Sequence, residues 1–131
     1  ADGKITPLKK GQHYNPLWSG PGGRMWMSII DSAKYCQSYL KSFQKNSILK
    51  LSTVRYLTKN IKIENSYNYG YGWFSKKHNN INVIYHGGAF LDTISHYRFI
   101  PEKNIGIVIC TNYNFDSNPM DQIINEFMKS I

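Results

Sequence analysis

The residues best suited to chemistry in this sequence form one run, His86-Gly87-Gly88-Ala89, which leads into the aromatic Phe90. Glycine is unfavourable inside a strand, so two in succession indicate a bulge or the close approach of a ligand or another backbone. A strand edge with small residues can present a backbone N–H to a developing oxyanion. A neighbouring imidazole can hydrogen-bond an anionic substrate group. Taken alone, the four residues slightly favour the other interpretation, a bulge beside a core histidine.

Other candidate residues do not form a site by their spacing. The remaining histidines, at 13, 78 and 96, are scattered, and neither cysteine has a histidine or cysteine neighbour at metal-ligand spacing. We therefore expect no metal and no cofactor. Cys36 and Cys110 stand where small apolar residues would serve, so we expect two buried free thiols. A bridge between them is possible but not indicated.

The elements that would position the run follow from hydrophobic periodicity. Ser28 and Asp31 have capping-box spacing, in which the acid returns a bond to the backbone N–H of the cap. The apolar residues that follow predict a helix from 28 to 43, with the stripe Ile29, Ala33, Cys36, Leu40 and Phe43. A shorter helix is predicted from 52 to 59, with Val54, Leu57 and Tyr56 facing inward. Residues 1–25 contain many prolines and glycines and are expected to be irregular.

After residue 65 the period shortens to about two residues, which predicts strands. The expected strands are 69–76, 82–90, 95–100 and 105–112, joined by short turns in an antiparallel meander. A final helix is predicted with Asn118 as its cap and Pro119 in its first turn. Its apolar face would cover the sheet and comprises Met120, Ile123, Ile124, Phe127 and Ile131.

Composition limits the class of protein. The chain has 131 residues, of which 41% are hydrophobic and 18% charged, enough to bury one core. The longest apolar run, at 105–110, is far below the roughly 20 residues of a membrane-spanning helix. The formal charge is +8: residues 1–62, with eleven Lys/Arg against two Asp, carry +9, and the remaining residues carry −1. These cations are dispersed, which favours a solvated face over nucleic-acid binding.

Several motifs, in their order along the chain, resemble the C-terminal part of the serine β-lactamase-related family. That family includes class C β-lactamases, penicillin-binding proteins, DD-carboxypeptidases, D-aminopeptidases and esterases. The resemblance covers nearly the whole chain. Its motifs are Pro21-Gly22-Gly23, the helix from Ser28 to Phe43, Tyr69-Gly70-Tyr71-Gly72-Trp73, His86-Gly87-Gly88, and the segment from Phe99 to Asn112.

The resemblance implies roles for individual residues. Members of the family attack substrate with a serine of a Ser-x-x-Lys motif, and a Lys-Thr-Gly or His-x-Gly motif lies on the facing strand. His86, Gly87 and Gly88 match the latter and would bind substrate. The backbone N–H of Ala89 would be one donor of the oxyanion hole. Asn112 resembles a position near the substrate carboxylate.

The nucleophile motif is the point of departure from the family. Ser-x-x-Lys spacing occurs at Ser38, Ser42 and Ser47, each followed by a lysine three residues on. We interpret all three as chance matches, because none is predicted to open a helix against the strand of His86. The family also has a motif that supplies proton transfer, and its Tyr-x-Asn form is absent from this sequence. The expectation is that this chain alone is inactive and that the parent protein is the hydrolase.

The expected fold class is therefore α+β, the C-terminal half of a β-lactamase/transpeptidase-like fold. We predict one partial domain over 1–131, with loops and helices in 1–64 and the sheet and terminal helix in 65–131. The sheet should have three to four antiparallel strands packed by the terminal helix. The resemblance implies a small-molecule or peptidoglycan-like substrate and an extracytoplasmic location. An uncovered sheet edge would favour a homodimer or a missing N-terminal partner, and a non-catalytic interaction module is the alternative function.

Overall fold

The centre of the protein is an antiparallel sheet of six strands, each paired with the next along the chain. The structure is a computed structural model, and it describes residues 20–23, 25–44, 47–63, 67–90, 93–112 and 119–131. The strands are β1 (Ile61–Ile63), β2 (Tyr67–Tyr69), β3 (Phe74–His78), β4 (Ile81–Phe90), β5 (Thr93–Ile100) and β6 (Ile105–Thr111). The α+β class and the antiparallel meander are confirmed. The sheet is larger than the three to four strands expected, and it begins before residue 65.

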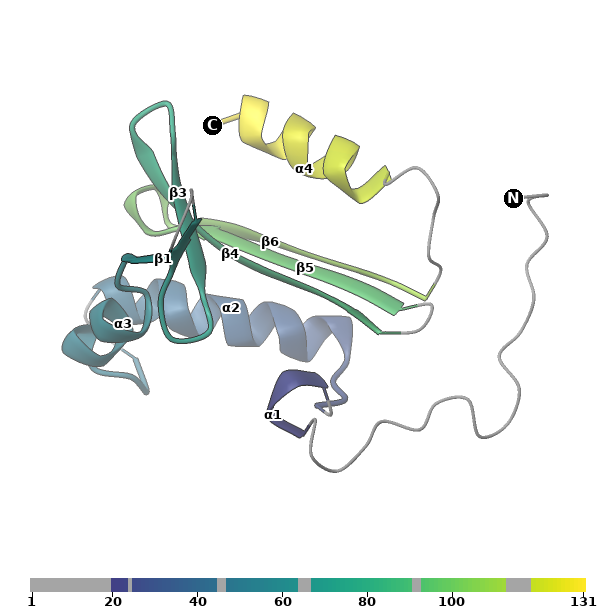
Figure 1. The fold of residues 1–131 in the computed structure, drawn as a ribbon, viewed down its shortest axis with the longest axis horizontal. Coiled ribbons are helices and arrows are strands. Elements are labelled where there is room, and N and C mark those ends of the chain that lie inside the picture. Colours follow the sequence, from purple (N-terminus) through teal and green to yellow (C-terminus); the bar gives the residue numbers. More distant parts are fainter. Residues whose placement is uncertain (1–19, 24, 45–46, 64–66, 91–92, 113–118) are drawn as a thin grey trace.

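The helices lie on both faces of the sheet (Figure 1). They are α1 (Gly20–Gly23), α2 (Ile29–Gln44), α3 (Leu51–Leu57) and α4 (Pro119–Lys129). Helices α2 and α3 cover one face and α4 covers the other, which gives three layers. The four-residue α1 lies in a stretch expected to be irregular. The proposed cap Asn118 is outside the described residues.

The first predicted strand, 69–76, is wrong because the chain turns in its middle. Gly70 N–H donates to the carbonyl of Trp73 at 2.7 Å, and Tyr71 N–H donates to the carbonyl of Leu57 at 2.9 Å. Gly72 has φ +88°, a conformation that suits glycine. A Cβ on Gly70 would lie 2.6 Å from the Leu57 carbonyl oxygen, so only glycine fits there. The two glycines therefore end β2 and start β3.

Strands β4 and β5 separate two hydrophobic cores, because successive side chains point to opposite faces. Ile84 and Phe99 are buried on the α2 face with Cys36, Tyr39, Leu40, Val54 and Trp73. Val83 and Ile100 are buried on the α4 face with Ile124 and Met128. The turn between β3 and β4 contains Asn79 and Asn80, both with positive φ, as a two-residue hairpin of type I′ requires.

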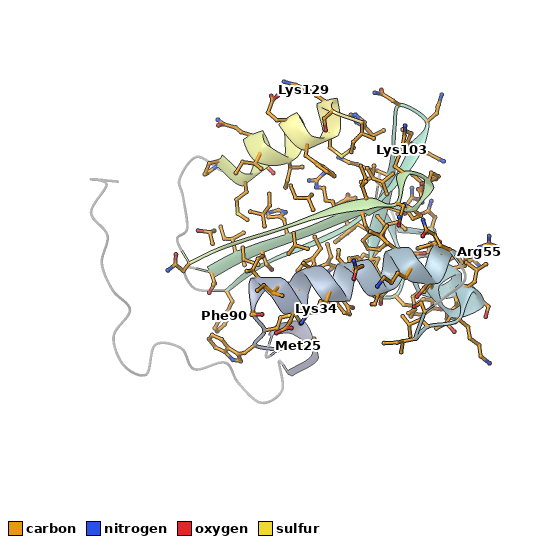
Figure 2. The ribbon with its side chains drawn as sticks, turned by 180° about the vertical axis from the view of Figure 1, so that it is seen from behind. Met25, Lys34, Arg55, Phe90, Lys103 and Lys129 are labelled. Carbon is orange, nitrogen blue, oxygen red and sulfur yellow. The ribbon has the colours of Figure 1, made fainter. Side chains whose placement is uncertain are left out.

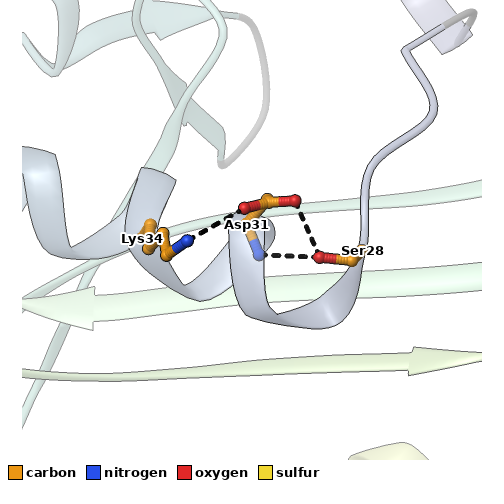
Figure 3. Close-up of polar contacts among 3 residues, drawn as sticks. All are labelled: Ser28, Asp31 and Lys34. Carbon is orange, nitrogen blue, oxygen red and sulfur yellow. Dashed lines mark hydrogen bonds and ion pairs between the residues drawn. The ribbon is translucent and has the colours of Figure 1, made fainter.

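Helix α2 begins as predicted, although one capping bond differs. The hydroxyl of Ser28 accepts a hydrogen bond from Asp31 N–H at 3.1 Å. It donates to the Asp31 carboxylate at 2.8 Å. The sequence instead predicted that this carboxylate would accept a hydrogen bond from the backbone N–H of Ser28. Lys34 Nζ lies 3.3 Å from the same carboxylate (Figure 3). These bonds fix where α2 starts. The first backbone hydrogen bond of the helix, from Ser32 N–H to Ser28 C=O, fixes the same point.

Some residues predicted to be buried are exposed. Ile29 is 50% exposed and Ile123 is 52% exposed, because the buried faces of α2 and α4 are rotated towards Ser32 and Met120. Cys36 is a buried free thiol, as expected, but Cys110 is exposed. Cys110 lies near the end of β6, which among the described strands pairs only with β5. In α3, Val54 is buried and Tyr56 is exposed.

Candidate functional site

The run His86-Gly87-Gly88-Ala89 lies in the second half of β4, where the sheet has an open edge. The β3–β4 pairing extends from His78↔Ile81 to Phe74↔Tyr85 and stops there. The β4–β5 pairing continues to Phe90↔Thr93. Within the described part of the chain, residues 86–90 thus have a strand neighbour on one side only. In an antiparallel strand alternate residues direct their N–H groups to each side, so this stretch offers free N–H groups to a ligand.

The imidazole of His86 faces the α2 side and lies among aromatic rings. Its ring centroid is 5.7 Å from that of Phe74, 6.3 Å from Tyr69 and 6.4 Å from Trp73. Partial burial lowers the pKa of His86 from its ordinary value, and a hydrogen bond with the backbone of Gly87 acts in the opposite direction. The imidazole is therefore neutral at pH 7 and can both donate and accept a hydrogen bond.

The two glycines differ in the space around them. A Cβ on Gly87 would point to the α4 face, opposite to His86, and would lie 3.1 Å from Nδ1 of His96. A larger residue at 87 would therefore crowd the imidazole of His96. A Cβ on Gly88 would meet only Ser95 Oγ, at 3.7 Å. Gly88 and Ala89 are both exposed. The backbone at 88 and 89 is therefore accessible from the open edge.

Asn112 is at the same end of the sheet but not next to the run. Ala89 pairs with Ile94, and Ile94 pairs with Thr111, which immediately precedes Asn112. Two strand spacings separate Ala89 from Thr111, about 10 Å. The structure thus brings His86 to Ala89 together and leaves Asn112 on the far side of β5, exposed.

Two of the three Ser-x-x-Lys serines, Ser38 and Ser42, lie in the second half of α2, and Ser47 follows the helix. All three hydroxyls donate hydrogen bonds to backbone carbonyls of α2. Ser38 donates to the Tyr35 carbonyl at 2.7 Å, and Ser42 donates to the Ser38 carbonyl at 2.6 Å. Ser47 also donates to the Ser38 carbonyl and shares a hydrogen bond with Ser42. Ser32 accepts a hydrogen bond from Tyr97 OH at 3.2 Å, and Tyr97 is the β5 residue that pairs with His86. Ser42 is ten residues further along, about 15 Å.

Sequence reasoning missed two features of this region. The aromatic surroundings of His86 depend on the turn at Gly70 and Gly72, which brings the rings of Tyr69 and Trp73 to 6.3 and 6.4 Å from the imidazole. The run Ser66-Tyr67-Asn68 has Ser-x-Asn spacing, a form found in the family. Ser66 lies outside the described residues. Asn68 pairs with Ser75, and Ser75 pairs with Ile84 of the α2-face core, so the register places Asn68 on the same face of the sheet as His86.

No set of three metal-ligating side chains is found in the described ranges. None of the described helices is long and apolar enough to cross a membrane. An open cavity of about 360 Å³ lies between α2 and β6, lined by residues that include Cys36, Leu40, Gly106 and Val108. This cavity lies at the β6 edge of the sheet, two strands beyond β4, and His86 does not line it. The β4 edge, and not this cavity, is the candidate site.

The fold and the open β4 edge define a class of protein, an α+β domain with helices on both faces of an antiparallel sheet. The family model described as Beta-lactamase matches residues 2–127, and the chain belongs to this serine β-lactamase-related family. Among solved structures it is similar to the octameric penicillin-binding protein homologue from Pyrococcus abyssi, with TM-score 0.59 and 25% identity. That match covers 66% of this chain and 20% of the homologue. No curated protein sequence matches the chain.

Proposed function

We propose that this chain supplies the substrate-binding strand of a serine hydrolase that acts on β-lactams, D-amino-acid peptides or related esters. His86 binds or polarises the substrate, and Gly87 and Gly88 let it approach the backbone. Ala89 N–H stabilises the oxyanion of the tetrahedral intermediate. The observation that carries this proposal is the open edge of β4 beyond Tyr85, at the motif where the family binds substrate.

The nucleophile of this proposal lies outside the 131 residues. Ser38, Ser42 and Ser47 all donate to carbonyls of α2; Ser42 lies in the last turn of α2 and Ser47 follows the helix. An attacking hydroxyl must lie within about 3–3.5 Å of the carbonyl that the oxyanion donor holds. The chain alone therefore binds but does not turn over substrate. The parent protein acts outside the cytoplasmic membrane in this proposal, as its substrate class requires.

The first test measures hydrolysis of a chromogenic β-lactam, a D-alanyl-D-alanine peptide and a nitrophenyl ester by the chain alone. The expected result is no burst and no turnover. A burst that disappears when Ser38, Ser42 or Ser47 is changed to alanine would show that the nucleophile is internal, and this part of the proposal would fail.

The second test uses the chain joined to the coding sequence immediately upstream of it. If that sequence carries Ser-x-x-Lys, the joined protein should hydrolyse one of the three substrates. Gly88→Val should reduce kcat/KM at least tenfold, because its side chain projects from the same face as His86, beside the open edge. Lys129→Gln is the control, since Lys129 is exposed on α4 and pairs with Glu126. Equal activity in G88V and K129Q would remove β4 from the active site.

A second function is favoured by the edge of β6. Among the described strands β6 pairs only with β5, and its sequence Ile-Gly-Ile-Val-Ile-Cys-Thr carries no charge or proline to block further pairing. The chain would then be an interaction module that binds a protein partner by strand addition. Light scattering would detect a dimer, and Val108→Pro should abolish it by removing a backbone N–H. A monomer at all concentrations would speak against self-association through β6.

A further inference from the structure

Basic side chains gather around Tyr85 on the α4 face of the sheet, opposite to His86. Tyr85 pairs with Arg98 across β4 and β5, and His96 pairs with Gly87 one step further along. Lys76 of β3 is opposite Val83, which is buried in the α4-face core. Directly paired residues share a face, so all four side chains lie on the α4 side. We call Lys76, Tyr85, His96 and Arg98 the Arg98 cluster.

The two cations of the Arg98 cluster lie against the same ring. Arg98 Cζ is 5.3 Å from the Tyr85 ring centroid, and Lys76 Nζ is 5.6 Å from it. Both distances are within the range of a cation–π contact. The ring thus holds two positive charges close together on a surface that is only partly open to water.

One donor of this cluster lacks a partner. Arg98 Nε is buried and has no hydrogen-bond partner among the residues that the structure describes. Buried donors in folded proteins are nearly always bonded, so an unbonded Nε indicates a missing acceptor. A guanidinium donates through Nε and one terminal nitrogen together, which matches the two oxygens of a carboxylate or phosphate.

The charges of the cluster are unbalanced. Burial lowers the pKa of Lys76, and the charge of Arg98 lowers it further. Burial also lowers the pKa of His96, where Asp121 opposes the effect and Arg98 adds to it. Asp121, in the first turn of α4, is the acid that acts on Lys76, His96 and Arg98 alike. In the described part of the chain, three basic groups thus share one carboxylate.

We propose that the Arg98 cluster binds one small oxyanion, a carboxylate or a phosphate, between the sheet and the first turn of α4. The anion accepts hydrogen bonds from Arg98 Nε and the Lys76 ammonium, and it offsets the positive charge gathered at Tyr85. His96 contributes a neutral N–H donor. This site is on the opposite face of β4 from the proposed substrate site, and it does not depend on hydrolase activity.

The test is a titration of the chain with inorganic phosphate and, separately, with acetate, at constant ionic strength set with chloride. The Arg98 Nε–Hε resonance and the His96 ring resonances are followed by NMR. Saturable shifts at both residues are expected. Arg98→Met should weaken binding at least tenfold, and Arg98→Lys, which keeps the charge but lacks Nε, should weaken it by a smaller factor. Lys129→Met, a change of an exposed lysine outside the cluster, should leave it unchanged.

The two anions distinguish the source of the ligand. Tighter binding of phosphate supports a free phosphate or phosphorylated ligand. Comparable or tighter binding of acetate supports a carboxylate, such as an acidic side chain of a partner polypeptide. Shifts that fail to saturate, or an equal loss of binding in R98K and K129M, would overturn the proposal. If R98M does not fold, as judged by its spectrum, R98K decides.

Discussion

His86 is the residue whose protonation should be most visible in the stability of the protein. Burial lowers its pKa from the ordinary value of 6.5, and burial has the same effect on His96. Below pH 6.5 the unfolded chain therefore binds more protons than the folded chain. The free energy of unfolding should fall as the pH decreases through 6.5, and it should stop falling once the pH is below the folded-state pKa values.

Urea unfolding at pH 7.5 and pH 5 measures this effect. The loss between the two pH values should be smaller in His86→Gln than in the wild type, because one of the two histidines no longer titrates. A loss of the same size in H86Q would mean that His86 titrates alike in both states.

Gly70 is the residue at which a single methyl group should do most damage. Its Cβ would lie 2.6 Å from the carbonyl oxygen of Leu57 and 2.7 Å from that of Lys59, and neither backbone atom can move without disturbing α3 or its connection to β1. Gly70→Ala should cost about 1–3 kcal/mol of stability, as overpacking does. Gly88→Ala is the matched control, since it has room and should change stability by less than about 1 kcal/mol. Equal urea midpoints for both variants would contradict this.

At the scale of elements, the start of α2 depends on Ser28 more than on Lys34. The Ser28 hydroxyl bonds both Asp31 N–H and the Asp31 carboxylate. Loss of an N-cap side chain costs about 0.5–2 kcal/mol, so Ser28→Ala should lower stability by that amount. Lys34→Ala removes an ion pair whose side chains are 70% and 57% exposed, and such pairs contribute about 0.2–1 kcal/mol. Chemical denaturation of both variants checks the order, which a larger loss in K34A would reverse.

The long elements were predictable because their apolar periodicity extends over seven or more residues. Helices α2 and α4 and strands β4, β5 and β6 all have close counterparts among the sequence predictions. Strands β1 and β2 have three residues each, too few to show alternation. The sequence pattern predicts strand at the turn of Gly70 and Gly72, because the aromatic residues there alternate as they do in a strand.

The candidate site was predictable in its residues and not in its accessibility. The glycines of the run indicated the close approach of a ligand. The open edge of β4 begins where its pairing with β3 ends, at Phe74, directly after the turn at 70–73. The sequence of β4 itself does not show where this turn lies. Asn112 followed β6 as expected, but its separation from Ala89 is set by strand order, which periodicity does not fix.

For the whole molecule, family membership and architecture agree on a sheet with helices on both faces, and two of its edges are exposed in different ways. The second half of β4 is open beside a motif of small residues and a histidine. Among the described strands, β6 pairs along one side only, and its unpaired edge lies beside apolar residues and the free thiol of Cys110. The homologue from Pyrococcus abyssi is described as octameric, and this chain spans 20% of it. Whether β6 mediates assembly here is part of the second proposal.

The pairing of β4 has a consequence for how single amides exchange hydrogen with solvent. Ile84 and Tyr85 have strand neighbours on both sides, and Val83 and Ile84 are fully buried, so the amides of 83–85 should exchange only when the whole sheet opens. Over 86–90 every second N–H points to the open edge. Exchange followed by NMR should therefore give slow rates from Val83 to Tyr85 and then alternate slow and fast rates towards Phe90. Uniform protection along all of β4 would mean that another segment closes the edge in solution.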